Sequence, residues 1–156
     1  MKRIFIIFFI LLALGTLIAA IDKQSTARAS VVDASGTFSI HGKAPRGFTN
    51  IAVMEIAGND EYGWKANPPF YGFIRLNNKA QTDYKLFKPT IDDKHISFKT
   101  RAVAGVSYEF AGTFTSLDFA EKDMRNQTVL SGTLKKLSGG KVLAEAKLDF
   151  DYTPGG

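Results

Sequence analysis

From residue 36 onward, apolar and polar side chains alternate along the chain with a period of two. In the clearest run, Val106, Tyr108 and Phe110 alternate with Ser107 and Glu109. Successive side chains of a β-strand point to opposite faces of a sheet, whereas these apolar positions would scatter around an α-helix. The alternation therefore predicts strands that have one buried face and one solvated face.

The C-terminal end of the chain repeats this pattern over its longest run. A strand there places every second residue on the same face, so we expect one apolar face and one charged face. The positions expected on the buried face are Val142, Ala144, Ala146, Leu148, Phe150 and Tyr152. The positions expected on the solvated face are Glu145, Lys147, Asp149 and Asp151.

The same reading along the whole chain predicts eight strands joined mostly by short links. Ala104-Gly105 and Gly139-Gly140 predict tight hairpin turns, and residues 89–93 predict a further turn. Strands and helices do not alternate, so the pattern favours an all-β, antiparallel meander that forms a small barrel or a two-layer sandwich. The run 51–57 also fits a helix, and residues 116–127 fit a loop with one helical turn. The expected strands are 36–42, 51–57, 70–76, 84–87, 96–98, 106–114, 128–137 and 142–152.

The N-terminal residues have a different character from the rest of the chain. Lys2 and Arg3 precede an uncharged apolar run, residues 4–21, and the sequence Ala-Arg-Ala follows at 27–29. A basic start, an apolar centre and an A-x-A site are typical of a secretory signal peptide. We therefore expect residues 1–29 to be a signal peptide cleaved before Ser30, with a cut after Ala20 as the alternative.

The apolar run is also close to the length that spans a bilayer, about 20 residues. If it is not cleaved, residues 4–21 form a hydrophobic helix that anchors the protein in the cytoplasmic membrane, with Lys2 and Arg3 on the cytoplasmic side. In both cases we expect residues 30–156 to be a single exported domain, periplasmic or extracellular.

The net charge of +5 looks basic enough for nucleic-acid binding, but its distribution argues against it. Residues 1–29 carry +3, so the predicted domain carries only +2. We therefore expect no nucleic-acid partner. The absence of cysteine excludes disulfides, thiol nucleophiles and Cys-ligated zinc.

Motifs for catalysis or cofactor binding are missing from the sequence. There is no G-x-S-x-G nucleophile motif and no glycine-rich phosphate loop. Asp92, Asp93 and His95 are too few for a metal site, and Asp149 and Asp151 share a face with charges of both signs. We expect no enzyme activity, no metal and no cofactor. An active site assembled from distant residues remains the alternative.

The most unusual segment is 58–72, which concentrates aromatic side chains in a predicted loop. Trp and Tyr give a large contact area at low entropic cost, so such loops often mark binding surfaces. In the alternative interpretation, Trp64 folds back and closes one end of the barrel. The candidate ligand-binding residues are Tyr62, Trp64, Lys65, Phe70 and Tyr71.

These features lead to two hypotheses about function. In the first, the protein is a non-enzymatic β-domain that binds a small apolar or amphipathic ligand, or a partner surface, through the 58–72 loop. The interior of an eight-stranded barrel has room for one small ligand. In the second, residues 4–21 tether a structural or assembly protein of the cell envelope to the membrane.

Overall fold

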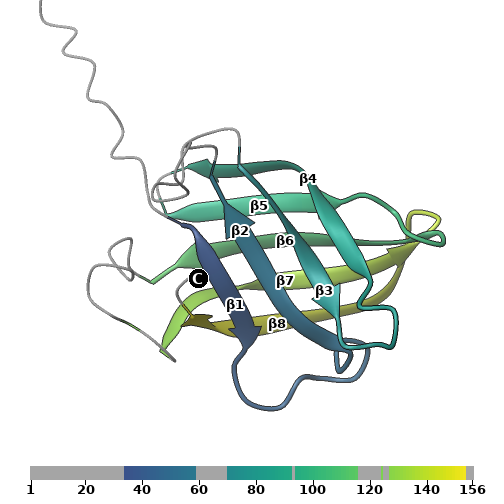
Figure 1. Ribbon diagram of the computed structural model, residues 1–156, viewed down its shortest axis with the longest axis horizontal. Coiled ribbons are helices and arrows are strands. Elements are labelled where there is room, and N and C mark those ends of the chain that lie inside the picture. Colours follow the sequence, from purple (N-terminus) through teal and green to yellow (C-terminus); the bar gives the residue numbers. More distant parts are fainter. Residues whose placement is uncertain (1–33, 59–69, 93, 116–123, 125–126, 154–156) are drawn as a thin grey trace, which may run out of the picture.

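A computed structural model describes residues 34–58, 70–92, 94–115, 124 and 127–153 (Figure 1). Each strand pairs antiparallel with the next, and the first pairs with the last, so the sheet closes into a barrel. The predicted eight-stranded meander is confirmed, and the barrel is the form it takes. The strands are β1 (Gly36–Ile40), β2 (Ile51–Ala57), β3 (Tyr71–Leu76), β4 (Asp83–Asp92), β5 (His95–Thr100), β6 (Val106–Phe114), β7 (Thr128–Ser138) and β8 (Lys141–Thr153).

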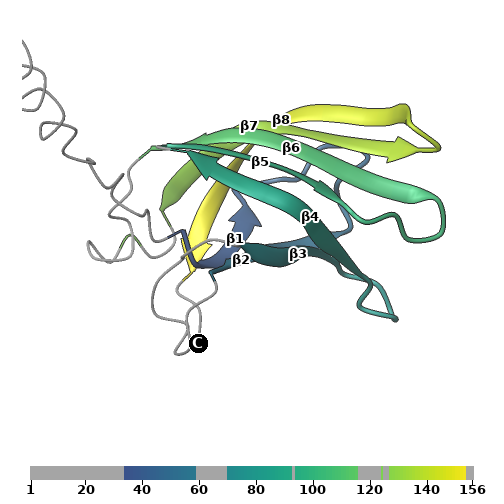
Figure 2. The same ribbon diagram turned by 90° about the horizontal axis from the view of Figure 1, so that it is seen from above.

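The barrel is flattened, with β1–β3 on one side, β5–β8 on the other and β4 between them (Figure 2). In an up-and-down meander, all links from an odd-numbered to an even-numbered strand lie at the same end. These links are residues 41–50, 77–82, 101–105 and 139–140. We call this end of the barrel the hairpin end; two of its turns touch, because Gly139 N–H donates to Gly105 O at 3.3 Å.

Both predicted two-residue turns are present. Ala104 and Gly105 have φ of 49° and 77°, and Gly139 and Gly140 have φ of 54° and 81°. Positive φ at both central residues is the requirement of the type I′ turn, whose twist matches that of the strands it joins. Glycine adopts this conformation without steric cost, which explains the predictive value of the two motifs.

The turn predicted at 89–93 is wrong, because β4 continues through Pro89 to Asp92. The pairing of β4 with β5 shifts between Phe87 and Thr90, and Lys88 has a φ of 47°. This irregularity is a β-bulge, where a strand tolerates a proline that lacks the N–H needed for a ladder hydrogen bond. A turn-forming composition is therefore accommodated inside a strand.

The buried face predicted for the last strand is correct except at Val142. Leu148, Phe150 and Tyr152 are buried, whereas the Val142 side chain is 45% exposed. The register of β7 with β8 shifts next to it: Lys136 pairs with Ala144, but Leu137 pairs with Val142. The extra residue in β8 breaks the alternation of inward and outward side chains, so the regular pattern ends before the tip of the hairpin.

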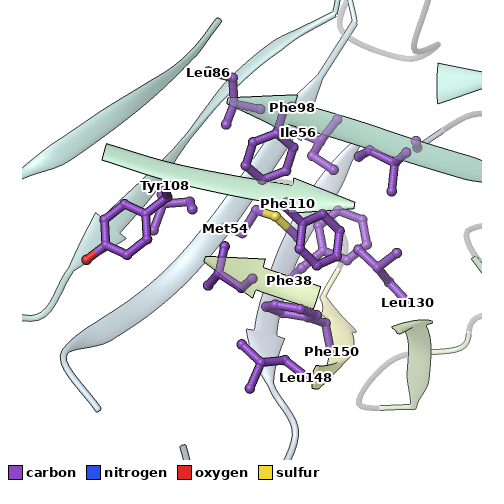
Figure 3. Close-up of a cluster of buried hydrophobic side chains, with 14 of the residues drawn as sticks. Phe38, Met54, Ile56, Leu86, Phe98, Tyr108, Phe110, Leu130, Leu148 and Phe150 are labelled. Atoms are coloured by element: carbon purple, nitrogen blue, oxygen red, sulfur yellow. The ribbon is translucent and has the colours of Figure 1, made fainter. Parts of the chain in front are cut away.

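Side chains from all eight strands fill the inside of the barrel (Figure 3). The ring of Phe110 lies 5.4 Å from the ring of Phe98 and 5.5 Å from that of Phe150, centroid to centroid. Gly112 and Gly132 leave room for the Phe110 ring, since a Cβ at either position would collide with it. The predicted inward face of β6 is confirmed by the burial of Tyr108, Phe110 and Phe114.

Tyr108 is the one core residue with an unsatisfied polar atom among the residues that the structure describes. Its hydroxyl is buried and has no hydrogen-bond partner, and its ring packs edge-on against Tyr84 at 4.9 Å. Burial raises the pKa of Tyr108 to about 12, because the charged phenolate loses its hydration.

The strands and their core lie within residues 34–153. A closed sheet that surrounds its own core has the properties of an independently folding unit. In the part of the chain that the structure describes, no helix is long and apolar enough to cross a membrane. The predicted signal or anchor, residues 1–29, lies outside the described residues.

Candidate functional site

A hollow of about 490 Å³ lies on the outer face of the barrel, over β4, β5, β6 and β7. Ser97, Ala111 and Thr133 are direct neighbours in the strand register and form a row of small side chains across it. The residues that line the hollow are Phe87, Lys88, Thr90, Ser97, Phe98, Lys99, Glu109, Phe110, Ala111, Thr133 and Lys135.

The depth of this hollow follows from the size of neighbouring side chains. The next outward row, in register along the same strands, consists of the long side chains of Lys99, Glu109 and Lys135. Outward positions on one strand are two residues apart, so a short row beside a long row leaves a depression between them. The bulge after Phe87 also bends β4 at the rim of the hollow.

A second hollow, of about 550 Å³, continues the first along the same strands. The two share Thr90, Ser97, Ala111 and Thr133, so they form one continuous depression. We call this depression the outer groove. Its two halves differ in chemistry, because the first half carries the aromatic ring of Phe87, whereas the second half is lined by hydroxyl, glycine, His and Lys groups.

Phe87 is the distinctive residue of the outer groove. It sits on the solvated face of β4, where its side chain is 44% exposed. Lys88 Nζ lies 5.5 Å and Arg101 Cζ lies 5.6 Å from the centre of its ring. Cations at this distance from an aromatic face are attracted by the ring quadrupole. An exposed apolar ring therefore lies within 5.6 Å of two positive charges.

The charge around Phe87 is not neutralised by carboxylates. Lys99 pairs with Glu109 at 2.7 Å, and Lys135 lies 3.6 Å from Glu145. Within the described ranges of the chain, no carboxylate forms an ion pair with Lys88 or Arg101. This end of the groove is therefore electropositive, and it combines that charge with apolar surface.

Of the ligand-binding residues predicted from the sequence, the structure describes Phe70 and Tyr71. Tyr62, Trp64 and Lys65 lie outside the described residues. Phe70 is half-buried, and Tyr71 is 55% exposed at the start of β3, where it pairs with Ala57 of β2. Neither Phe70 nor Tyr71 lines the outer groove.

The titratable side chains at the junction of β1 and β8 form an ion pair. His41 Nδ1 lies 2.9 Å from a carboxylate oxygen of Asp151, and Thr128 Oγ1 donates to the same carboxylate at 2.9 Å. The hydrogen bond and the charge of Asp151 raise the pKa of His41. The contacts join neighbouring strands at an exposed edge, which is the geometry of a surface ion pair.

The metal-binding and catalytic residues considered from the sequence form no group of three in the part of the chain that the structure describes. Asp92 and His95 face each other in the β4–β5 register, and Asp93 lies outside the described residues. Among the residues that the structure describes, no three His, Asp or Glu side chains are arranged to hold a metal ion. Asp149 accepts a hydrogen bond from Ser131 on the neighbouring strand.

The sequence contains one signal for the groove, in the residues around Phe87. Lys85, Leu86 and Phe87 alternate, and Leu86 belongs to the buried face, so Phe87 has to point outward. A large apolar residue on a solvated face, followed by Lys88 and Pro89, indicates a candidate binding surface. The predicted turn at 89–93 hid this alternation.

Comparison with known proteins yields no match: no family model, no curated protein and no solved structure is significantly similar to this chain. Any assignment of function therefore has to come from the geometry and chemistry of the molecule itself.

Proposed function

We propose that this protein is a non-enzymatic binding domain that holds an amphipathic molecule with an anionic head group in the outer groove. The observation that carries the proposal is the environment of Phe87, whose exposed ring has Lys88 and Arg101 within 5.6 Å, neither of them paired with a carboxylate of the described residues. The ring provides apolar contact, and the cations provide charge for a carboxylate, phosphate or sulfate.

The size and lining of the groove support this class of ligand. Small-molecule sites usually occupy about 300–1,000 Å³, and the half next to Phe87 occupies about 490 Å³. Ala111 and the carbon stems of Lys99 and Lys135 add apolar surface beside the ring. A hydrocarbon chain can therefore lie along the groove while its head group meets the cations.

The packing of the barrel core favours a binding site on the outer surface over one inside the barrel. Small eight-stranded barrels are either filled by side chains or hold one small ligand. Here the rings of Phe38, Phe98, Phe110 and Phe150 contact other aromatic rings within the core. A core packed in this way shifts the binding function to the surface.

We propose further that the domain is exported, with residues 1–29 acting as a signal peptide or as an anchor formed by 4–21. Its ligand or partner would then be found in the periplasm or outside the cell. The exposed side chain of Tyr71, 55% accessible, keeps the 58–72 loop as a second candidate binding surface. A tethered envelope protein that binds a partner there is the alternative function.

Calorimetric titration of residues 30–156 with dodecyl phosphate, below its micellar concentration, tests the groove. We expect saturable binding that Phe87→Ala weakens about tenfold, because one buried aromatic contact is worth roughly 1–2 kcal/mol. Lys88→Ala and Arg101→Ala should each weaken the binding of dodecyl phosphate, whereas the binding of uncharged dodecanol should stay unchanged. The matched control is Tyr71→Ala, which removes another exposed aromatic residue, this one from the other candidate surface.

The outcomes separate the two surfaces. If Tyr71→Ala weakens binding and Phe87→Ala does not, the site is the 58–72 loop and the groove proposal is wrong. If dodecyl trimethylammonium binds as tightly as dodecyl phosphate, the cations do not select the ligand, and the anionic head group has to be abandoned.

A further inference from the structure

The hairpin end of the barrel differs in charge from the rest of the molecule. The four links at this end, residues 41–50, 77–82, 101–105 and 139–140, contain no Asp or Glu. The four links thus carry no acidic side chain of their own, although Asp83 directly follows the second link and Asp151 of β8 pairs with His41 of the first. The cations in these links and beside the last of them are Lys43, Arg46, Lys79, Arg101, Lys136 and Lys141.

The same end carries an exposed apolar tip. Val142 is 45% exposed and Leu143 is 55% exposed, although both are aliphatic and adjacent. The bulge in the β7–β8 ladder turns them outward, because it places one extra residue between the partners of Lys136 and Leu137. We call Val142 and Leu143 the aliphatic tip. The hairpin of β7 and β8, which bears the aliphatic tip, extends to one extreme of the barrel in both views (Figures 1 and 2).

Two contacts bring other links against the hairpin that bears the aliphatic tip. Gly139 N–H donates to Gly105 O, so the turn that follows Arg101 touches the turn that precedes Lys141. Gly47 packs so closely on Ala144 that a Cβ on it would lie 2.8 Å from the Ala144 Cβ, which brings the link containing Arg46 beside the tip. Two links that contain cations therefore contact the hairpin of the aliphatic tip, and Lys141 directly precedes Val142 in the chain, whereas the Arg101 guanidinium itself lies over Phe87.

We propose that the hairpin end docks on the surface of an anionic phospholipid bilayer, with the aliphatic tip entering the interfacial region. Aliphatic side chains lower their free energy by leaving water, and Lys and Arg beside them remain at the level of the lipid phosphates. Each cation near an anionic surface adds a further electrostatic contribution. This inference does not rest on the outer groove, since the tip residues do not line it.

A bilayer fits these features better than an acidic macromolecule does. Val142 and Leu143 lie near the start of β8, just beyond a two-residue turn, and such a narrow tip offers little area to a folded partner. An apolar medium that adapts its shape covers both side chains fully. Nucleic-acid binding, by contrast, would use the cations but would leave the aliphatic side chains in water.

Vesicle flotation with residues 30–156 tests the proposal, and this form removes the contribution of the apolar segment 4–21. We expect binding to vesicles of phosphatidylcholine with about one third phosphatidylglycerol, and weak binding to pure phosphatidylcholine. The double variant Val142→Ser/Leu143→Ser should lose at least tenfold in the partition coefficient. Both side chains are exposed, so circular dichroism of the variant should match that of the parent.

Matched lysine variants distinguish binding through the hairpin end from binding through the overall positive charge of the domain. Lys141→Ser should weaken binding about fivefold, whereas Lys94→Ser, which removes an exposed lysine from the opposite end, should leave it unchanged. The Val142→Ser/Leu143→Ser variant keeps every groove residue and should bind dodecyl phosphate as the parent does, so failure of the groove proposal and failure of this one are distinguishable.

Two results would overturn the docking surface. One is unchanged flotation of the Val142→Ser/Leu143→Ser variant, which would show that the tip does not enter the lipid. The other is retention on an acidic polymer such as polyglutamate without any binding to vesicles, which would assign the cations to an acidic macromolecule.

Discussion

Phe110→Ala should destabilise the barrel by about 3–5 kcal/mol, as truncation of a core phenylalanine does. The side chain is only 3% exposed, so its transfer from water is almost complete in the folded state. Burial of such a ring is worth roughly 2–3 kcal/mol. The tilted and edge-on contacts with Phe98 and Phe150 add about 1–2 kcal/mol in total. Urea unfolding of residues 30–156, followed by far-UV circular dichroism, measures the change.

Gly112 provides a second, independent test of the position of this ring. A Cβ at Gly112 would lie 2.6 Å from Phe110 Cζ and 2.7 Å from Ser131 O. Gly112→Ala should therefore cost about 1–3 kcal/mol through overpacking. In the Phe110→Ala background the collision with the ring disappears, so the double variant should be more stable than the sum of the single changes predicts, by at least about 1 kcal/mol.

The control for both measurements is Phe87→Ala, which removes the same side chain from the solvated face. Its cost should stay below about 1 kcal/mol, because the exposed ring gains little from folding. A cost below about 1 kcal/mol for Phe110→Ala would mean that the inward face of β6 has been inverted. Strict additivity of Phe110→Ala and Gly112→Ala would refute the packing of the ring over Gly112.

Two further predictions concern ionisable groups. Tyr108→Phe should stabilise the barrel by about 1 kcal/mol, because it removes a buried hydroxyl without a partner. The variant should also lose the tyrosine titration at about pH 12. A loss of stability in urea unfolding would show that the hydroxyl has a partner. The pKa of His41 lies above 6.5, so its ion pair with Asp151 is complete below that pH and is lost as the pH rises through the raised value. In an NMR titration Asp151→Asn should lower the pKa of His41 toward its ordinary value, and an unchanged midpoint would argue against the pair.

The sequence predicts the fold well because most strands obey the alternation that a half-buried sheet requires. Phe98, Phe110 and Phe150 are inward at the positions that period two assigns to them. Successive hairpins leave few topologies for eight short strands, and Ala104-Gly105 identifies its turn through backbone conformation alone. The choice between barrel and sandwich depends on pairing of the first strand with the last. Such long-range pairing leaves no local pattern in the sequence.

The sequence-based predictions of turns and buried faces fail where a β-bulge interrupts the alternation of side chains. At Pro89 the local composition favours a turn, but pairing with β5 keeps the segment in the sheet. At Val142 an inserted residue changes the facing of side chains that the pattern assigns to the core. A bulge depends on the partner strand as much as on the bulged one, so neither case is visible in a single stretch of sequence.

Both proposed surfaces arise beside these two bulges, and there is a physical reason for this. A regular half-buried strand places its large apolar residues inward, so it cannot offer both apolar area and cations to a ligand. Phe87 and Leu143 are exceptions, since each is large, apolar and exposed next to a shift in register. Leaving such side chains in water gives up stabilisation that burial would provide. Phe87→Ser and Leu143→Ser should accordingly leave the stability of the free domain nearly unchanged, while each weakens its own interaction.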